Sequence, residues 1–298
     1  MIVFTPANNK GGVGKTGVSA MFAEYCSLIL KKKTLAIDLD GQCNFSSRYL
    51  PMEVDPSSPE GHIPPIHPDY DPTDPEDEDW DGRSSISDIF YGKPVIPYPT
   101  YISDLDVAPA NGSRLLSAEH VRKNEVAHKV HDRLNEFLSL PEVKSTYDVV
   151  VIDTAPSKGP LTISAVRAAT HIVIPSIMEE NSIHGVYGIL QLWMQENFKR
   201  SNREKIQLVG IMPNMFDNRT ALHNQLYDDL LKHPELGKYV FPKDIKLSRR
   251  VIFAETACTG SNPRSVFDLP KSNVARQEAL RVCEYMAEKV FSFQGECV

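Results

Sequence analysis

A glycine-rich segment near the N-terminus carries the strongest chemical signal in the sequence. Residues 10–16 read Lys-Gly-Gly-Val-Gly-Lys-Thr and follow a short apolar run at 2–4. Glycines let a backbone curl until several N–H groups point at one polyphosphate. A helix starting directly afterwards would place its positive end under the bound charge. We therefore assign nucleotide binding to Lys10, Gly11, Gly12, Val13, Gly14, Lys15, Thr16 and Gly17.

Two side chains of this segment have a defined task in a phosphate loop. Lys15 would reach the terminal phosphates, and the Thr16 hydroxyl would bind Mg²⁺. Counted from Gly11, the spacing is one residue short of the usual G-x-x-x-x-G-K-[ST] motif. Counted from Lys10, it is the deviant form K-G-G-x-G-K-[ST].

This deviant loop resembles that of the ParA/MinD family of P-loop ATPases, in which a signature lysine stands at the position of Lys10. The resemblance implies an ATP-dependent homodimer in which Lys10 of one subunit neutralises phosphate charge bound to the other. It also implies ATP and Mg²⁺ as cofactors, slow intrinsic hydrolysis, and catalytic roles for Lys10 and Lys15.

The segment Asp38-Leu39-Asp40 follows the second apolar run and resembles the family's D-x-D-P-Q-G-N. Strand periodicity puts Asp38 and Asp40 on one side of the chain, facing the phosphate loop. By resemblance, Asp40 activates or orients the attacking water and Asp38 helps to hold Mg²⁺. Gly41 and Cys43 stand where relatives have Pro and Gly, which puts the stiffness of this loop in doubt.

Three further assignments complete the predicted site. A buried strand at 149–152 ends in Asp153, the Walker B pattern, so Asp153 should meet Mg²⁺ through water. Residues 210–217 resemble the family segment that ends a strand beside the adenine, and Asn214 in this segment has both the donor and the acceptor that an adenine edge requires. Pro242 is expected on the other side of the base. Gly17 stands where most relatives have a second Thr or Ser, which predicts somewhat weaker nucleotide binding.

The elements that position these residues follow from the hydrophobic pattern. Apolar, β-rich runs alternate with helical stretches, at 2–5, 34–37, 149–152, 172–175, 208–212 and 239–241. This alternation predicts α/β architecture: a doubly wound, mostly parallel sheet with helices on both faces, in a single P-loop domain over 1–298. Ligands of such sheets bind beyond the carboxyl ends of the strands, where the polar motifs fall.

Residues 51–83 break the pattern with prolines and acids, and we predict a loop or disordered insertion there. Residues 51–82 contain eleven acids and no Lys or Arg, so removing their −11 from the total charge of −7 leaves +4 on the rest. The insertion is either a solvated spacer or a segment that competes with DNA phosphates for a basic face or receives a basic partner.

Composition favours a cytoplasmic protein. No apolar stretch approaches the length of a membrane span, and the N-terminus leaves no room for a signal peptide. The C-terminus lacks a basic amphipathic helix, so no membrane partner is expected. The cysteines are odd in number and scattered, which predicts free thiols at Cys26, Cys43, Cys258, Cys283 and Cys297.

A cluster of cations between 243 and 281 suggests the purpose of nucleotide binding, because clustered cations suffice to hold a phosphate backbone. We expect the ATP-bound dimer to bind double-stranded DNA without sequence specificity, to associate with the nucleoid, and to let go when a ParB-like centromere-binding partner stimulates hydrolysis. The alternatives are a ParA-like ATPase that positions another cargo, and a P-loop ligase or kinase acting on a small molecule. The DNA-binding candidates are Lys243, Lys246, Arg249, Arg250, Lys271 and Arg276.

Overall fold

The computed structural model describes residues 1–121, 124–259 and 263–292. Its centre is a seven-stranded sheet in the order β5-β6-β2-β7-β1-β8-β9. Neighbouring strands are parallel except for the β5–β6 pair at one edge. The strands are β1 (Ile2–Pro6), β2 (Thr34–Leu39), β5 (Tyr98–Pro99), β6 (Leu105–Ala108), β7 (Val149–Thr154), β8 (His171–Ser176) and β9 (Gln207–Pro213).

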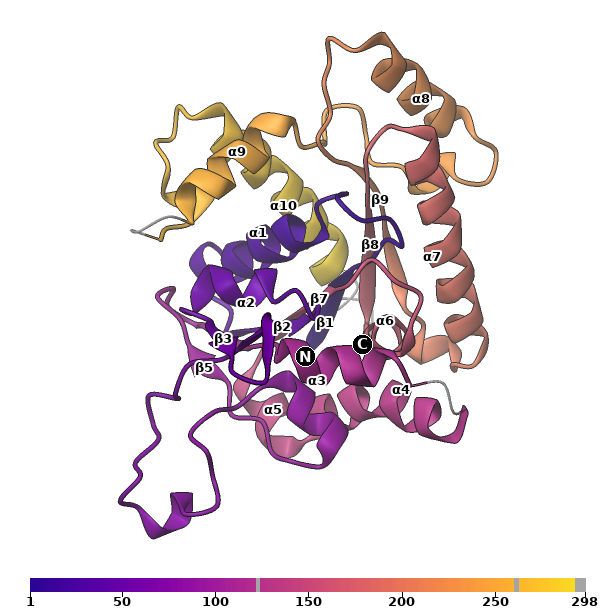
Figure 1. Cartoon of the computed structure of the whole chain (residues 1–298). Helices are drawn as coiled ribbons and strands as arrows, with labels where there is room; N and C mark the ends of the chain where they lie inside the picture. The colour runs from indigo at the N-terminus through magenta and orange to yellow at the C-terminus, as the bar shows by residue number, and fades with distance from the viewer. Residues whose placement is uncertain (122–123, 260–262, 293–298) are drawn as a thin grey trace.

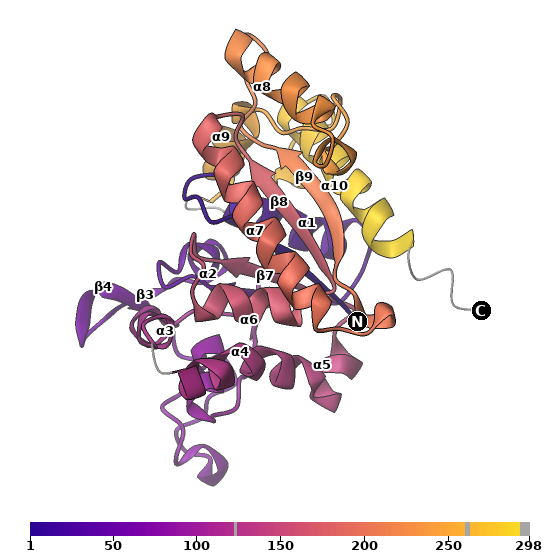
Figure 2. The same ribbon diagram turned by 90° about the vertical axis from the view of Figure 1, so that its right-hand side faces the viewer.

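Helices cover both faces of the sheet (Figures 1 and 2). Because successive strand residues point to opposite faces, Ile2 and Phe4 pack in the core that includes α1 and α10, whereas Val3 packs in the core that includes α4 and α6. The predicted doubly wound α/β fold is therefore confirmed. The helices are α1 (Lys15–Leu28), α2 (Asn44–Tyr49), α3 (Gly112–Glu119), α4 (Asn124–Ser139), α5 (Pro141–Thr146), α6 (Pro160–Ala168), α7 (Glu180–Phe198), α8 (Ala221–Lys232), α9 (Arg249–Cys258) and α10 (Val274–Ser292).

The predicted strand at 239–241 is wrong. Residues Gly237–Tyr239 form a 3₁₀ turn, and only Val240 pairs with Ile211, in an isolated parallel bridge. The ladder cannot continue because the next donor on β9 would be Pro213, which has no N–H, and the Pro213 carbonyl accepts from the Leu247 N–H instead. The short strands β5 and β6 had not been predicted, and they take the edge of the sheet on the far side of β2.

The insertion is more ordered than the sequence predicted. Strands β3 (Glu53–Asp55) and β4 (Ser58–Ile63) form an antiparallel hairpin. In the loop that follows, the His67 ring lies 5.6 Å from that of Trp80 and 4.4 Å from that of Tyr98. An aromatic cluster thus supplies the small core that the acidic composition had concealed. In both views this loop projects from the body on the side away from α8 and α9 (Figures 1 and 2).

Two compositional predictions can be compared with the described residues. Cys26, Cys43, Cys258 and Cys283 are buried free thiols, as predicted, and Cys297 lies outside the described residues. None of the helices in the described part of the chain has the length and apolar character that crossing a bilayer requires.

Candidate functional site

The phosphate loop connects β1 to α1 at the carboxyl edge of the sheet. Gly14 caps α1 with a φ of 85°, and Gly12 has a φ of 74°, both in the left-handed region that glycine adopts most readily. A Cβ on Gly14 would also lie 2.2 Å from Nδ2 of Asn214. Since no side chain caps the first turn of α1, its N–H groups can bind an anion.

Lys15 is buried in this loop although it carries an ammonium group, with 6% of the residue exposed. Its Nζ donates one long hydrogen bond, 3.4 Å, to the carbonyl of Lys10. Burial lowers the pKa of Lys15, and the charges of Asp153 and Asp40 oppose that shift. A buried ammonium with so little compensation is well suited to phosphate oxygens.

Two carboxylates face each other behind the loop. Asp38 of β2 lies in register with Asp153 of β7. Asp153 accepts hydrogen bonds from the Thr16 hydroxyl at 2.7 Å and the Ser19 hydroxyl at 3.0 Å, and Asp38 accepts two from Ser46 at 2.8 and 2.6 Å. Burial above all raises the pKa of Asp38 to about 7 and that of Asp153 to about 6. Neither serine had been predicted, although Ser19 lies one helical turn after Thr16.

This arrangement fits a hard divalent cation. Hydroxyl and carboxylate oxygens are the donors that Mg²⁺ prefers, and a cation would relieve the repulsion between the two buried acids. Within the described ranges, no group of three His, Cys, Asp or Glu side chains could hold a metal by itself. A cation bound here would therefore need phosphate and water ligands in addition to Thr16, Asp38 and Asp153.

Asp40 lies at the open side of the site. It is partly exposed, and its Oδ1 accepts a hydrogen bond of 3.0 Å from the Gln42 N–H. The turn that follows keeps the left-handed backbone of a glycine at Cys43, which has a φ of 56° and caps α2. Cys43 therefore adopts the backbone conformation that a glycine at this position would favour, and the role of Asp40 in orienting water stays a prediction.

Asn214 has a contact that the sequence did not reveal. It is fully buried, its Nδ2 donates to the Val13 carbonyl at 2.9 Å, and its Oδ1 accepts from the Met215 N–H at 2.8 Å. The end of β9 is thereby tied to the phosphate loop. Pro242 is exposed, and contacts of Asn214 and Pro242 with adenine stay predictions.

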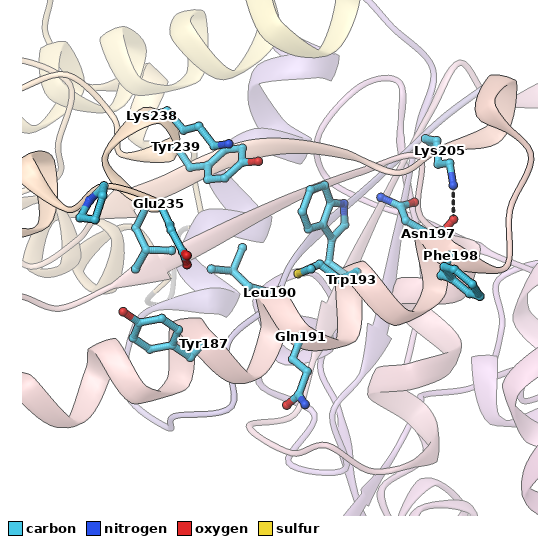
Figure 3. Close-up of a pocket in the computed structure, with 13 residues that line it drawn as sticks. Tyr187, Leu190, Gln191, Trp193, Asn197, Phe198, Lys205, Glu235, Lys238 and Tyr239 are labelled. Carbon is cyan, nitrogen blue, oxygen red and sulfur yellow. Dashed lines mark hydrogen bonds between the residues drawn. The ribbon is translucent and has the colours of Figure 1, made fainter.

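A pocket of about 360 Å³ opens directly beside the phosphate loop. Residues of the loop, α1, α2 and α9 line it, among them Gly14, Gly17, Arg48 and Glu255. A larger cavity of about 840 Å³ lies along the outer side of α7, where Leu190, Trp193 and Tyr239 contribute to its wall (Figure 3). Because none of the predicted site residues lines the larger cavity, we place the candidate site at the smaller one.

Lys10 turns toward its own subunit. Its Nζ lies 3.0 Å from a carboxylate oxygen of Glu179, which caps α7. The sequence offered no signal for Glu179, because the two residues are brought together only by the adjacent strands β1 and β8. Whether Lys10 reaches a second subunit stays a prediction.

The six cations predicted to bind DNA differ in their surroundings. Lys243 is paired with Asp228 at 2.5 Å, and the ammonium of Lys246 lies 4.3 Å from the centre of the Phe216 ring. Arg276 is partly buried, with an Nε that has no hydrogen-bond partner. Lys243, Arg249, Arg250 and Lys271 are exposed. Of these, Arg249, Arg250 and Lys271 remain the strongest candidates, because Lys243 is engaged with Asp228.

Comparison with known proteins places this geometry in a family context. A protein-family model described as an AAA domain matches residues 1–208. The sporulation initiation inhibitor protein Soj of Bacillus subtilis is 30% identical over 243 residues, covering 81% of this chain and 84% of that protein. The chromosome-partitioning ATPase Soj of Thermus thermophilus is 28% identical over 256 residues, 84% of either chain. Among solved structures, apo McdA of Cyanothece has a TM-score of 0.70 at 16% identity, covering 96% of this chain and 99% of that one.

Proposed function

Because the chain belongs to the ParA/MinD family of P-loop ATPases, related to chromosome and plasmid partition proteins, we propose that it is a Mg²⁺-dependent ATPase of DNA partition. In this proposal an ATP-bound dimer holds DNA without sequence specificity and releases it after hydrolysis. The observation that carries the proposal is the group of buried charges around the phosphate loop, Lys15, Asp38 and Asp153.

The chain's own residues divide the work of phosphoryl transfer, which needs mainly positioning and charge neutralisation. The N–H groups of the loop and of α1 hold the phosphate chain, and Lys15 neutralises its terminal charge. The Thr16 hydroxyl would bind a magnesium ion, Asp38 would help to hold its ligand shell, and Asp153 would meet it through water. Such an ion would supply further positive charge to the phosphates. Asp40, at the open side, orients the attacking water.

Dimerisation couples nucleotide state to DNA binding. Lys10 leaves Glu179 and neutralises phosphate charge in the second subunit, so the dimer is stable only while triphosphate is present. Two copies of the exposed cations on and near α9 then lie close enough to share one DNA backbone. A ParB-like partner stimulates hydrolysis, and the site of action is the nucleoid in the cytoplasm.

The test is DNA binding by wild type and Lys10→Ala in ATP, in ADP and without nucleotide. We expect wild type to bind DNA in ATP at least tenfold more tightly than in the other two states, and Lys10→Ala to lose that difference. Lys144→Ala, an exposed lysine on α5, serves as the control and should behave as wild type. DNA binding that ignores nucleotide would reject the mechanism.

A ParA-like ATPase that positions a cargo other than DNA is a second candidate, and the likeness to the fold of McdA is compatible with it. Both candidates share the nucleotide site and differ in the partner. Stimulation of ATP turnover by DNA separates both of them from a small-molecule ligase or kinase, in which DNA should have no effect.

A further inference from the structure

The missing side chain at Gly17 is replaced in space by a carboxyl group from another element. Helix α9 lies beside the start of α1 (Figure 1), and a Cβ on Gly17 would lie 2.7 Å from Oε2 of Glu255. The space that a threonine would fill at this position is therefore occupied by Glu255. The sequence predicted only the loss of a hydroxyl here.

Glu255 is buried, and none of the described residues donates a hydrogen bond to its Oε1. The residue is 5% exposed. The nearest cation is Arg48, 3.7 Å away, but Arg48 gives its short contact of 2.7 Å to Glu24. Burial above all raises the pKa of Glu255 to about 8. A buried carboxyl with one long ion pair and no hydrogen bond among the described residues is poorly compensated, so a ligand donor is the expected partner.

The position of Glu255 indicates which part of a ligand it would meet. It lines the pocket beside the phosphate loop together with Gly14, Thr16 and Gly17. A nucleotide whose phosphates lie on the loop and the N-terminus of α1 would have its first phosphate near Gly17, and the pocket beside Gly17 offers space for the ribose. The ribose is joined directly to the first phosphate, and its two hydroxyls are hydrogen-bond donors.

We infer that Glu255 binds the ribose hydroxyls of the nucleotide and makes the site selective for ribonucleotides. The inference rests on the proposed nucleotide-binding function and adds a specificity-determining residue to it. Gly17 has a defined part in this arrangement, because any side chain there displaces the carboxyl group. A site built to accept hydrogen bonds from a hydroxyl rejects the analogue that lacks it.

Equilibrium binding of ADP and of 2′,3′-dideoxy-ADP, which avoids turnover, tests the inference. We expect wild type to bind ADP at least tenfold more tightly, and Glu255→Ala to reduce that ratio to below threefold by losing affinity for ADP alone. Gly17→Thr should reduce the ratio similarly, since it moves Glu255. The control Glu288→Ala, on the exposed side of α10, should keep the wild-type ratio, and thermal unfolding confirms that each variant is folded.

The outcomes separate this inference from the proposed function. Equal binding of both nucleotides by wild type, or the wild-type ratio in Glu255→Ala, would overturn the inference and leave the ATPase intact. Failure of wild type to bind ADP, or ADP affinity unchanged in Lys15→Ala, would overturn the proposed function and this inference with it.

Discussion

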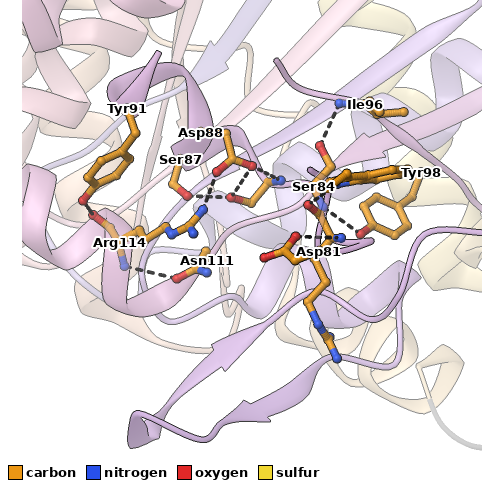
Figure 4. Close-up of polar contacts among 12 residues, drawn as sticks. Asp81, Ser84, Ser87, Asp88, Tyr91, Ile96, Tyr98, Asn111 and Arg114 are labelled. Atoms are coloured by element: carbon orange, nitrogen blue, oxygen red, sulfur yellow. Dashed lines mark hydrogen bonds and ion pairs between the residues drawn. The ribbon is translucent and has the colours of Figure 1, made fainter. Parts of the chain in front are cut away.

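Asp88 and Asp153 are both buried aspartates, but their surroundings are opposite. At the base of the insertion, Asp88 accepts a hydrogen bond of 2.8 Å from the Ser85 N–H and is paired with Arg114 (Figure 4). Its neighbours are also satisfied, since the Ser84 N–H donates to the Tyr98 hydroxyl at 3.1 Å. At the carboxyl edge of the sheet, Asp153 has hydroxyl partners and faces another acid.

The difference indicates which buried charges stabilise the fold and which are available to bind a ligand. A closed network of partners holds a segment in place and leaves nothing for an incoming molecule. Acids that are buried beside one another have raised pKa values and remain destabilising until a cation or donor arrives, which is typical of functional sites. We call these two regions the insertion base (Ser84, Ser85, Asp88, Tyr98 and Arg114) and the nucleotide edge (Lys15, Thr16, Asp38, Asp153 and Glu255).

The largest expected effect is on catalysis at the nucleotide edge. Asp153→Asn should lower ATP turnover by roughly 100-fold or more, because in the proposed mechanism it removes a charge that would hold Mg²⁺. Thermal stability should stay the same or rise, since the hydroxyls of Thr16 and Ser19 can reorient toward the amide. Steady-state hydrolysis measures the ATP turnover, and thermal unfolding measures the stability. Asp148→Asn, at the exposed start of β7, is the control, and a strongly destabilised Asp153→Asn would break the comparison.

The insertion base should give the reverse result. Asp88→Ala removes the partner of Arg114 and of the Ser85 N–H, so we expect a loss of about 2 kcal/mol in the free energy of unfolding. ADP affinity of the folded protein should change less than twofold. Urea denaturation measures the free energy of unfolding, and equilibrium binding measures the ADP affinity. Asp79→Ala, at an exposed position, is the control. A tenfold loss of ADP affinity would show that the two regions are not independent.

A smaller effect concerns pH. Unfolded aspartates titrate near pH 4, whereas the native pKa values of Asp38 and Asp153 are about 7 and about 6. The native state then binds more protons than the unfolded state between these limits, so stability should fall as the pH rises from 4.5 to 7.5. In Asp153→Asn this fall should shrink by about 2 kcal/mol in urea denaturation. An unchanged pH dependence in the variant would contradict the raised pKa.

The smallest effect is expected from the acids of the insertion. Because this loop projects away from α9 in both views, it is badly placed to compete with DNA for the same subunit's exposed arginines. Replacing the exposed acids Asp69, Asp79 and Asp81 with Asn should change DNA affinity less than twofold at fixed salt. A fivefold gain in DNA affinity would support the hypothesis that the insertion competes with DNA, and would contradict its interpretation as a solvated spacer.

The sequence predicted the local motifs, but not the contacts that these motifs make with distant parts of the chain. The phosphate loop, the doubly wound sheet and a buried Asp153 all follow from residue type and period, and the family resemblance is confirmed by the comparisons. Glu255 and Glu179 were missed, because each meets the loop only after distant strands or helices pack together. The hairpin β3–β4 was missed because residues 53–63 carry prolines and acids and no Phe, Tyr or Trp.

The contact between Lys10 and Glu179 also bears on timing. Exposed ion pairs of this kind contribute at most about 1 kcal/mol, so the contact with Glu179 would oppose the proposed transfer of Lys10 to a neighbour's phosphate only weakly. In the proposed cycle, Lys10 of a separated subunit would return to Glu179 after hydrolysis. Because this ion pair is weak, replacement of ADP by ATP, and not the breaking of the pair, would set the delay before the subunit joins another.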